Sequence, residues 1–386
     1  MRVEEMVREL VDSCSSVVHA VRLTAVVALT KGIIGGGRLS PATIGRSLSG
    51  RALPKHGIKR IDRLLGNPRM VRDRLFYFLT IAHRLLIGCP RPVILIDWTQ
   101  AGGRHVALVA AVPIGGRALP IYIEVHPQKK LGNAAVEKRF LCALKTIIPK
   151  ECRSVIVSDA GFKGPFFQAV LDQGWDFLGR IRGTTKAISS VGETISKEQF
   201  YGRASLTPVE LGSFALFVKQ KIPCRLVLVR KRRRPGPKRP PPASKEEREK
   251  RQAALDPWLL ATSMSDGDAA SIVATYARRM QIEETFRDAK NHRFGWSLGD
   301  VRLSTPQRVA VLLTLAALAF LVVTLIGMAA ERRGVHRAYQ ANTERRRILS
   351  FLVLATAILR RHSLDPCSRE DLLTSLAYIP TKVNLS

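Results

Sequence analysis

The feature that most constrains the fold is a run of 22 uncharged residues, Val309 to Ala330, bounded by Arg308 and Glu331. A helix of this length is long enough to cross a bilayer, so it must either span a membrane or be buried in protein on nearly all sides. Its many alanines and the interior Thr314 and Thr324 suit close helix packing. We therefore expect a buried core helix, with a membrane-associated basic protein as the alternative.

The charge of the chain indicates its partner. The 386 residues carry a formal net charge of +31, while 46% of them are hydrophobic. The hydrophobic content excludes a mainly disordered chain. An enzyme of small metabolites has no need for so much self-repulsion, whereas a polyanion would offset it. Nucleic acid is the first candidate partner and an anionic membrane surface the second.

The cysteines and the N-terminus indicate a cytoplasmic protein. No two cysteines form a C-x-x-C pair, which favours reduced thiols over a disulfide framework or a zinc site. The first ten residues include Glu4, Glu5 and Glu9 and lack an apolar stretch, so we expect no secretory signal.

Residues 1–90 have the apolar spacing of helices. Within them, the segment from Thr43 to Leu65 is dense in bases, among them Lys59, Arg60 and Arg63. Two short helices joined near Gly50 and Pro54 would place these bases on one face, which suits duplex DNA in a helix-turn-helix manner. The alternative is a solvated basic surface with no specific role.

From about residue 92 the pattern changes to short apolar runs. The runs predict strands at 93–96, 106–112, 119–125, 154–158 and 175–181, with helices at about 134–146 and 166–172. Gly115-Gly116 is typical of a hairpin turn. The order β-β-β-α-β-α-β predicts a mixed sheet with helices on its faces, and hence an α/β fold.

The rest of the chain alternates between irregular and helical patterns. Between 183 and 257 only two strands, 214–219 and 225–229, are predicted, followed by a basic, proline-rich tract at 230–242. This tract is expected to be a mobile loop that lies along phosphates, or else a merely solvated tract. A strand at 258–263, a long helix at 267–291 and a helical remainder follow. The predicted divisions are 1–90, 91–182, 183–257, 258–304 and 305–386.

Two aspartates mark a candidate metal site. Asp97 and Asp159 each directly follow an apolar strand, at the rim where open α/β sheets place their sites. Glu283 or Glu284 on the long predicted helix supplies a third acid. Converging carboxylates repel one another, and a divalent cation such as Mg²⁺ or Mn²⁺ resolves the conflict. Two such ions are known to catalyse in-line displacement at a phosphodiester. Either aspartate alone would more simply be a cap or turn residue.

The long predicted helix carries a second pattern. Tyr276, Arg279, Glu283 and Lys290 recur at helical spacing, so one continuous helix would place all four on one face. On such a face the carboxylate of Glu283 would bind a metal ion at the centre. The cations and the phenol on either side of it would bind phosphates. Glu284 lies about 100° further round the helix axis than Glu283. The alternative is an exposed stripe with ordinary pairing of Arg279 and Glu283.

Three stretches together carry a resemblance to a known family. They are Ile96-Asp97-Trp98-Thr99, Ser158-Asp159-Ala160-Gly161-Phe162, and the region from Tyr276 through Ile282-Glu283-Glu284-Thr285-Phe286-Arg287-Asp288-Ala289-Lys290. They resemble the signature regions of DDE transposases of bacterial insertion sequences, in the Y-R-E-K branch called insertion-sequence family four. The basic run from Gly57 to Asn67 resembles the N-terminal DNA-binding region of that branch. The sequence departs from the family pattern at Ala160 and Met280.

The resemblance implies a ribonuclease-H-like catalytic core with a β-rich insertion, between a helical N-terminal DNA-binding region and a helical C-terminal region. It makes Asp97, Asp159 and Glu283 the catalytic residues that bind two Mg²⁺ or Mn²⁺ ions. It makes Tyr276, Arg279 and Lys290 contacts to transposon-end DNA, and Trp258 a platform for a flipped base, for which the alternative is a plain core residue.

The implied function is cut-and-paste transposition through a hairpin intermediate. The implied partners are terminal inverted repeats and target DNA, with a homodimer formed on DNA and no membrane. The alternative is a catalytically inactive or domesticated DNA-binding derivative, although the presence of all three acids argues against it.

Overall fold

The computed structural model describes residues 1–48, 50–231, 241, 244–245, 248, 251, 255–293, 295–361 and 367–385. They form two compact units: unit 1 contains Met1–Ser154 and Met280–Ser386, and unit 2 contains Val155–Arg279. Both mix helices with strands, which confirms the predicted α/β class. Most of the basic tract predicted at 230–242 lies outside the described residues.

Unit 1 begins with helices, as predicted for residues 1–90. They are α1 (Val3–Val11), the 3₁₀ helix η1 (Asp12–Ser16), α2 (Ala20–Gly36), α3 (Pro41–Arg46), α4 (Pro54–Leu65) and α5 (Pro68–Leu86). Proline occupies the first turn of α3, α4 and α5, where its missing N–H costs nothing. Helices α3 and α4 cross at two glycines: a Cβ on Gly57 would lie 2.2 Å from the Gly45 carbonyl oxygen. Only glycine allows so close an approach.

The sheet of unit 1 is an antiparallel meander of β1 (Val93–Gln100), β2 (His105–Ile114) and β3 (Arg117–Pro127). Every residue of β2 is buried, because both faces of the strand are covered. The predicted hairpin at Gly115-Gly116 is confirmed, with φ of +58° and +85°. The predicted end of the first strand was wrong: β1 continues past Asp97, which pairs with Val109 of β2. Asp97 interrupts the apolar run in the sequence although it lies inside the paired strand. For this reason the predicted strand ended too early.

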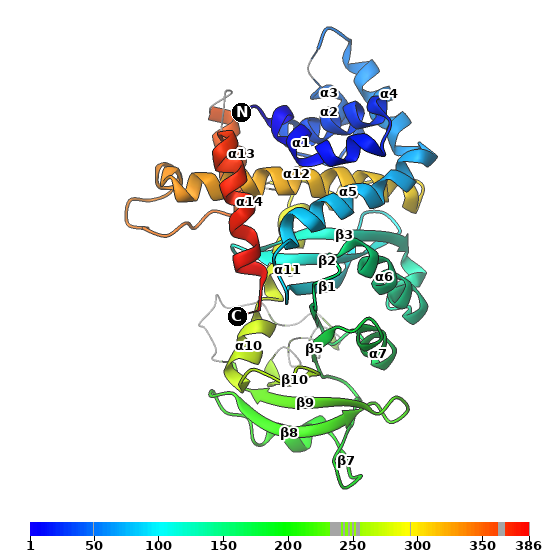
Figure 1. The fold of residues 1–386 in the computed structure, drawn as a ribbon, viewed down its shortest axis with the longest axis vertical. Coiled ribbons are helices and arrows are strands. Elements are labelled where there is room, and N and C mark those ends of the chain that lie inside the picture. The colour runs from blue at the N-terminus through cyan, green and yellow to red at the C-terminus, as the bar shows by residue number, and fades with distance from the viewer. Residues whose placement is uncertain are drawn as a thin grey trace. The chain divides into compact units, whose positions relative to one another are not determined.

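Helix α12 (Pro306–Arg332) is the core of unit 1. It lies between the N-terminal helices and β3 (Figure 1). Among the described residues it is the one helix long and apolar enough to cross a membrane, and its apolar window is entirely buried inside the protein. The prediction of a buried core helix is therefore confirmed. Gly327 lets Phe351 approach, since a Cβ there would meet the ring at 2.7 Å.

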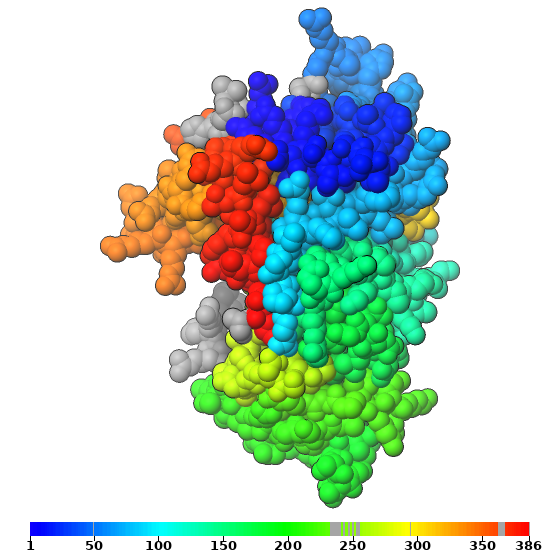
Figure 2. Space-filling view, in the orientation of Figure 1, coloured from blue at the N-terminus to red at the C-terminus, as the bar shows by residue number. Residues whose placement is uncertain are grey.

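The remaining helices of unit 1 surround this core. They are η2 (Gln128–Lys130), α6 (Ala134–Ile147), α11 (Met280–Lys290), η3 (Leu298–Asp300), η4 (Val335–Tyr339), α13 (Phe351–Arg361) and α14 (Arg369–Val383). Helix α14, in red, lies against the cyan α5 on one face of the unit (Figure 2). The start of α14 also contacts α1, with the Arg369 guanidinium 3.1 Å from the Glu9 carboxylate.

Unit 2 is built on a second set of strands. Strand β4 (Val155–Ser158) runs parallel to β5 (Asp176–Arg180), and the crossover between them contains α7 (Gly164–Asp172). The order continues antiparallel through β10 (Trp258–Thr262), β9 (Ile222–Val229) and β8 (Val209–Leu216) to the short β6 (Ala187–Ile188) and β7 (Thr194–Ile195). Helices α8 (Lys197–Tyr201) and α10 (Ala269–Ala277) also belong to the unit.

Two predictions for this part of the chain need correction. The strand placed at 214–219 is β8, which ends at Leu216 because Phe217 takes a positive φ of 62°. The long helix predicted at 267–291 is two helices, since α10 ends at Ala277 and α11 begins at Met280. The amides of Arg278 and Arg279 bond back to carbonyls three residues earlier, which tightens and ends the first helix. No glycine or proline signals this break.

Candidate functional site

A cleft in unit 1 brings together two of the predicted acids. Its volume is about 450 Å³, and its lining includes Asp97, Leu131, Glu283, Phe286 and Lys290. Asp97 comes from the middle of β1, whereas the other charged side chains come from α11. Glu283 and Lys290 are seven residues apart, close to two helical turns, so they share a face of α11. The cleft therefore combines two carboxylates with the Lys290 amine and the Arg287 guanidinium.

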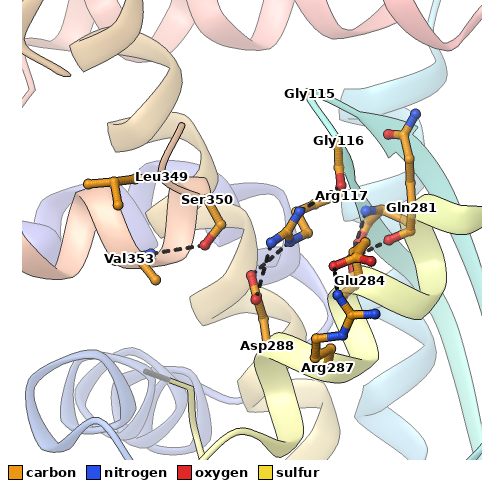
Figure 3. Close-up of polar contacts among 12 residues, drawn as sticks. Gly115, Gly116, Arg117, Gln281, Glu284, Arg287, Asp288, Leu349, Ser350 and Val353 are labelled. Carbon is orange, nitrogen blue, oxygen red and sulfur yellow. Dashed lines mark hydrogen bonds and ion pairs between the residues drawn. The ribbon is translucent and has the colours of Figure 1, made fainter. Parts of the chain in front are cut away.

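The phase of α11 is set by polar contacts with the start of β3. The Thr285 hydroxyl accepts a hydrogen bond from the Ala118 amide at 2.7 Å and lies 3.1 Å from the Ala118 carbonyl oxygen. One turn later, the Asp288 carboxylate pairs with the Arg117 guanidinium through contacts of 2.8 and 3.3 Å (Figure 3). These contacts lock one face of the helix to the hairpin, which leaves the face of Glu283 toward the cleft.

Glu284 takes a different partner from Glu283. Its carboxylate accepts a hydrogen bond from the Arg287 guanidinium at 2.6 Å (Figure 3). Glu283, not Glu284, is among the residues that line the cleft with Asp97. The two neighbouring glutamates therefore have different environments.

Lys290 and Asp97 interact electrostatically in the cleft. Burial lowers the pKa of the Lys290 ammonium, and the negative charge of Asp97 opposes that shift. Lys290 and Asp97 therefore lie near enough to interact while sharing a partly desolvated space. On the backbone side, the Asp97 carboxylate accepts a hydrogen bond from the Trp98 amide at 2.8 Å, and the Trp98 indole donates to Glu137 at 3.0 Å. These bonds fix the orientation of β1 at the aspartate.

Unit 2 contains the other predicted aspartate. Asp159 directly follows β4, as the sequence predicts, and its carboxylate accepts a hydrogen bond from the Gly161 amide at 2.8 Å. This bond makes a turn in which the aspartate is half-buried. In neither unit, taken by itself, do the described residues bring three His, Cys, Asp or Glu side chains together for a metal ion.

The helix break separates the four-residue pattern. Tyr276 and Arg279 belong to unit 2, whereas Glu283 and Lys290 belong to unit 1, so the prediction that one continuous helix carries all four was wrong. Tyr276 is buried, and burial raises the pKa of its hydroxyl. Its ring meets Trp258 edge-on at 4.8 Å, and the Arg279 guanidinium lies 5.9 Å from the ring centroid.

Trp258 is itself buried, with 6% of its surface exposed. The Lys231 ammonium lies 3.7 Å from the centroid of its ring, a cation–π contact. In the described conformation the ring is part of the core around Tyr276. This environment is the one expected if Trp258 is a core residue rather than a platform for a flipped base.

Sequence reasoning missed a pair of neighbouring cations, of which one lies beside Tyr276. Arg180, at the end of β5, interacts electrostatically with Tyr276, and burial together with Arg182 lowers the pKa of Arg180 to about 10. Arg180 also donates hydrogen bonds to the carbonyl oxygens of Asp256 and Pro257. The signal was present: two arginines alternate with apolar residues at the end of an otherwise buried strand.

The predicted N-terminal bases form a separate basic groove in unit 1. Lys59, Arg60 and Arg63 of α4 line it together with residues of α2, and its volume is about 720 Å³. Lys59, Arg60 and Arg63 are exposed, whereas Ile61, Leu64 and Leu65 on the opposite face of α4 are buried. The helix thus presents its cations to solvent.

The family model described as "Transposase DDE domain" matches residues 89–322, more than half of the sequence. The match contains both aspartates, Glu283 and most of α12. No curated protein matches the chain significantly.

Proposed function

The chain belongs to the family of transposases with a DDE domain, and from this premise we propose that it catalyses cut-and-paste transposition of a bacterial insertion sequence. The branch we propose is the one with the Y-R-E-K signature, insertion-sequence family four. The single observation that carries the proposal is the cleft where Asp97 and Glu283 lie together with Lys290. Carboxylates beside an amine suit a reaction at a phosphodiester, because they hold metal while the amine holds phosphate.

The donor set fits divalent metal ions. Asp97 and Glu283 offer hard carboxylate oxygens in a cleft with room for water and phosphate oxygens. We propose that Asp159 joins them in a ribonuclease-H-like core, and that the three residues hold two Mg²⁺ or Mn²⁺ ions. When bound, such ions supply nucleophile activation and charge stabilisation at the leaving oxygen.

The other residues position the DNA. The Lys290 ammonium, next to Asp97, would bind a phosphate adjoining the scissile bond. Tyr276 and Arg279 would contact the transposon end, with Trp258 as the platform for an unpaired base once it becomes exposed. Lys59, Arg60 and Arg63 would hold the terminal inverted repeat along the α4 groove, where their charges face solvent.

The proposed sequence of reactions has three parts. Water attacks the phosphodiester at the element's end and releases a 3′-hydroxyl. This hydroxyl attacks the opposite strand to give a hairpin, which is then opened by hydrolysis. The regenerated 3′-hydroxyl attacks target DNA. We further propose that the protein acts as a homodimer on paired DNA ends, in the bacterial cytoplasm.

The neighbouring glutamates provide a matched test. Purified protein is incubated with Mg²⁺ and supercoiled DNA that carries the element's ends, taken from the flanks of its own gene. Glu283→Gln should abolish cleavage while end binding in a gel-shift assay stays within about threefold, because the α4 groove is unchanged. Glu284→Gln, whose carboxylate pairs with Arg287, should keep cleavage within about tenfold.

Three results would count against the proposal. Normal cleavage by Glu283→Gln would remove this residue from the catalytic set. Loss of cleavage by Glu284→Gln alone would show that the assigned helix face is wrong. Strong end binding by a wild-type protein that never cleaves would favour the catalytically inactive DNA-binding derivative.

A further inference from the structure

The outer border of the cleft carries a small basic surface. It consists of Arg104, in the turn between β1 and β2, and Lys129 and Lys130 of η2, and we call these three residues the basic rim. The two segments adjoin, because the Gln128 amide donates a hydrogen bond to the Arg104 carbonyl oxygen at 2.9 Å. Leu131, which follows η2, lines the cleft itself. The basic rim therefore borders the space that contains Asp97 and Glu283.

The basic rim is held rigidly by the fold. His105 and Pro127 are paired across β2 and β3, so both segments leave the sheet at the same end. Gly102 takes a φ of +86°, and a Cβ there would lie 2.6 Å from the Val301 carbonyl oxygen. This close packing fixes the turn that carries Arg104. Because the backbone of the basic rim is already fixed, it needs no further ordering on binding, which suits a docking surface.

The chemistry of the basic rim is that of backbone binding. All three cations are exposed, and neither segment, 100–105 or 127–133, contains an acid, a Phe, a Tyr or a Trp. Single-stranded nucleic acid is usually held by aromatic stacking, and sequence is read by side chains that fit base edges. A set of exposed lysine and arginine charges instead contacts phosphates without regard to sequence.

We propose that the basic rim binds the phosphate backbone of the target duplex and holds it over the cleft for joining. This inference rests on the proposed function, and it adds a surface separate from the α4 groove. The α4 groove is proposed to hold the element's end, whereas a target is an arbitrary duplex. The sequence-independent chemistry of the basic rim matches the second partner.

The test compares cleavage of ends with joining to a target. The rim variant carries Arg104→Ala, Lys129→Ala and Lys130→Ala, and joining is measured with pre-cleaved ends and a plasmid target. We expect the ratio of joining to cleavage to fall about tenfold or more, because three phosphate contacts are lost. The plot of log joining rate against log salt should become less steep by roughly 2 to 3, at about 0.9 for each lost contact.

Two controls separate charge from position. Arg337→Ala, Arg345→Ala and Arg346→Ala together remove the same charge from an exposed segment. The neighbouring Arg347 bonds to the Gly115 carbonyl oxygen, at the opposite end of the β2–β3 hairpin. Since β2 has 10 residues, the two ends are roughly 30 Å apart. This variant should join normally, and so should one with Arg104→Lys, Lys129→Arg and Lys130→Arg, which keeps the charge.

Each alternative result is distinguishable. If the wild type neither cleaves nor joins, the proposed function fails. If the wild type does both and the rim variant has an unchanged joining-to-cleavage ratio, the target assignment alone is overturned. Equal loss of cleavage and joining would also overturn it, because the basic rim would then serve the element's end. Matching thermal unfolding of the variants checks that these exposed substitutions leave the fold intact.

Discussion

The ion pair between Arg117 and Asp288 should be an important support of the helix that carries Glu283. Its contacts of 2.8 and 3.3 Å are bidentate, and the two side chains are only 21% and 14% exposed. Exposed ion pairs contribute about 0–1 kcal/mol, whereas loss of one partner from a fully buried pair costs about 3–5 kcal/mol. A mostly buried pair lies between these limits, so Asp288→Ala should lower the free energy of unfolding by about 2 kcal/mol.

The assay is a double-mutant cycle on stability. Arg117→Ala, Asp288→Ala and the double variant are unfolded by urea and by heat. For a unit of this size, about 2 kcal/mol corresponds to a fall in Tm of roughly 4–8 °C. The coupling energy should be about 1–2 kcal/mol, because once one partner is gone the second substitution costs little more.

The same helix offers a matched control. Glu284 pairs with Arg287, but these side chains are 27% and 66% exposed. Glu284→Ala should therefore change the free energy of unfolding by less than about 1 kcal/mol. Additive effects of Arg117→Ala and Asp288→Ala, or an effect of Glu284→Ala as large as that of Asp288→Ala, would refute the reasoning.

Three further predictions concern other parts of the protein. Gly57→Ala should cost about 1–3 kcal/mol in urea unfolding because its Cβ would meet the Gly45 carbonyl oxygen, whereas Gly35→Ala has open space and should not destabilise. Glu124 is buried, which raises its pKa, but hydrogen bonds from His126 and Tyr122 outweigh this and leave the pKa below its ordinary value of 4.5. The stability lost in Glu124→Gln should therefore be greatest above pH 4.5 and disappear as the pH falls through the folded-state pKa, which unfolding curves against pH would reveal. Affinity for end DNA should fall linearly on a log–log plot against salt, with a slope near −0.9 per phosphate contact, and salt-independent binding would contradict the α4 groove assignment.

The sequence was most informative where local pattern and burial coincide. The uncharged run in α12 required either a membrane or burial in protein, and its apolar window is buried. The hairpin at Gly115-Gly116 was equally secure, since both residues take positive φ. Asp159 was placed correctly because β4 ends directly before it. In these places the chemistry of a few adjacent residues is sufficient.

Other features were decided by tertiary structure. The break between α10 and α11 has no glycine or proline to signal it, because it depends on where the packing of one unit ends and that of the other begins. The role of Asp288 was invisible as well, since its partner Arg117 is 171 residues away in the chain.

The candidate site also combines features that the sequence indicated with features that only the tertiary structure decided. Spacing alone indicated that Glu283 and Lys290 share a helix face, because helical geometry is local. Their meeting with Asp97 in one cleft needed β1, the hairpin and α11 to pack together. The basic rim, likewise, is formed by two segments about 25 residues apart that only the β2–β3 pairing brings side by side. Sequence therefore determined the chemical groups and their local phase, while long-range packing decided which of them meet.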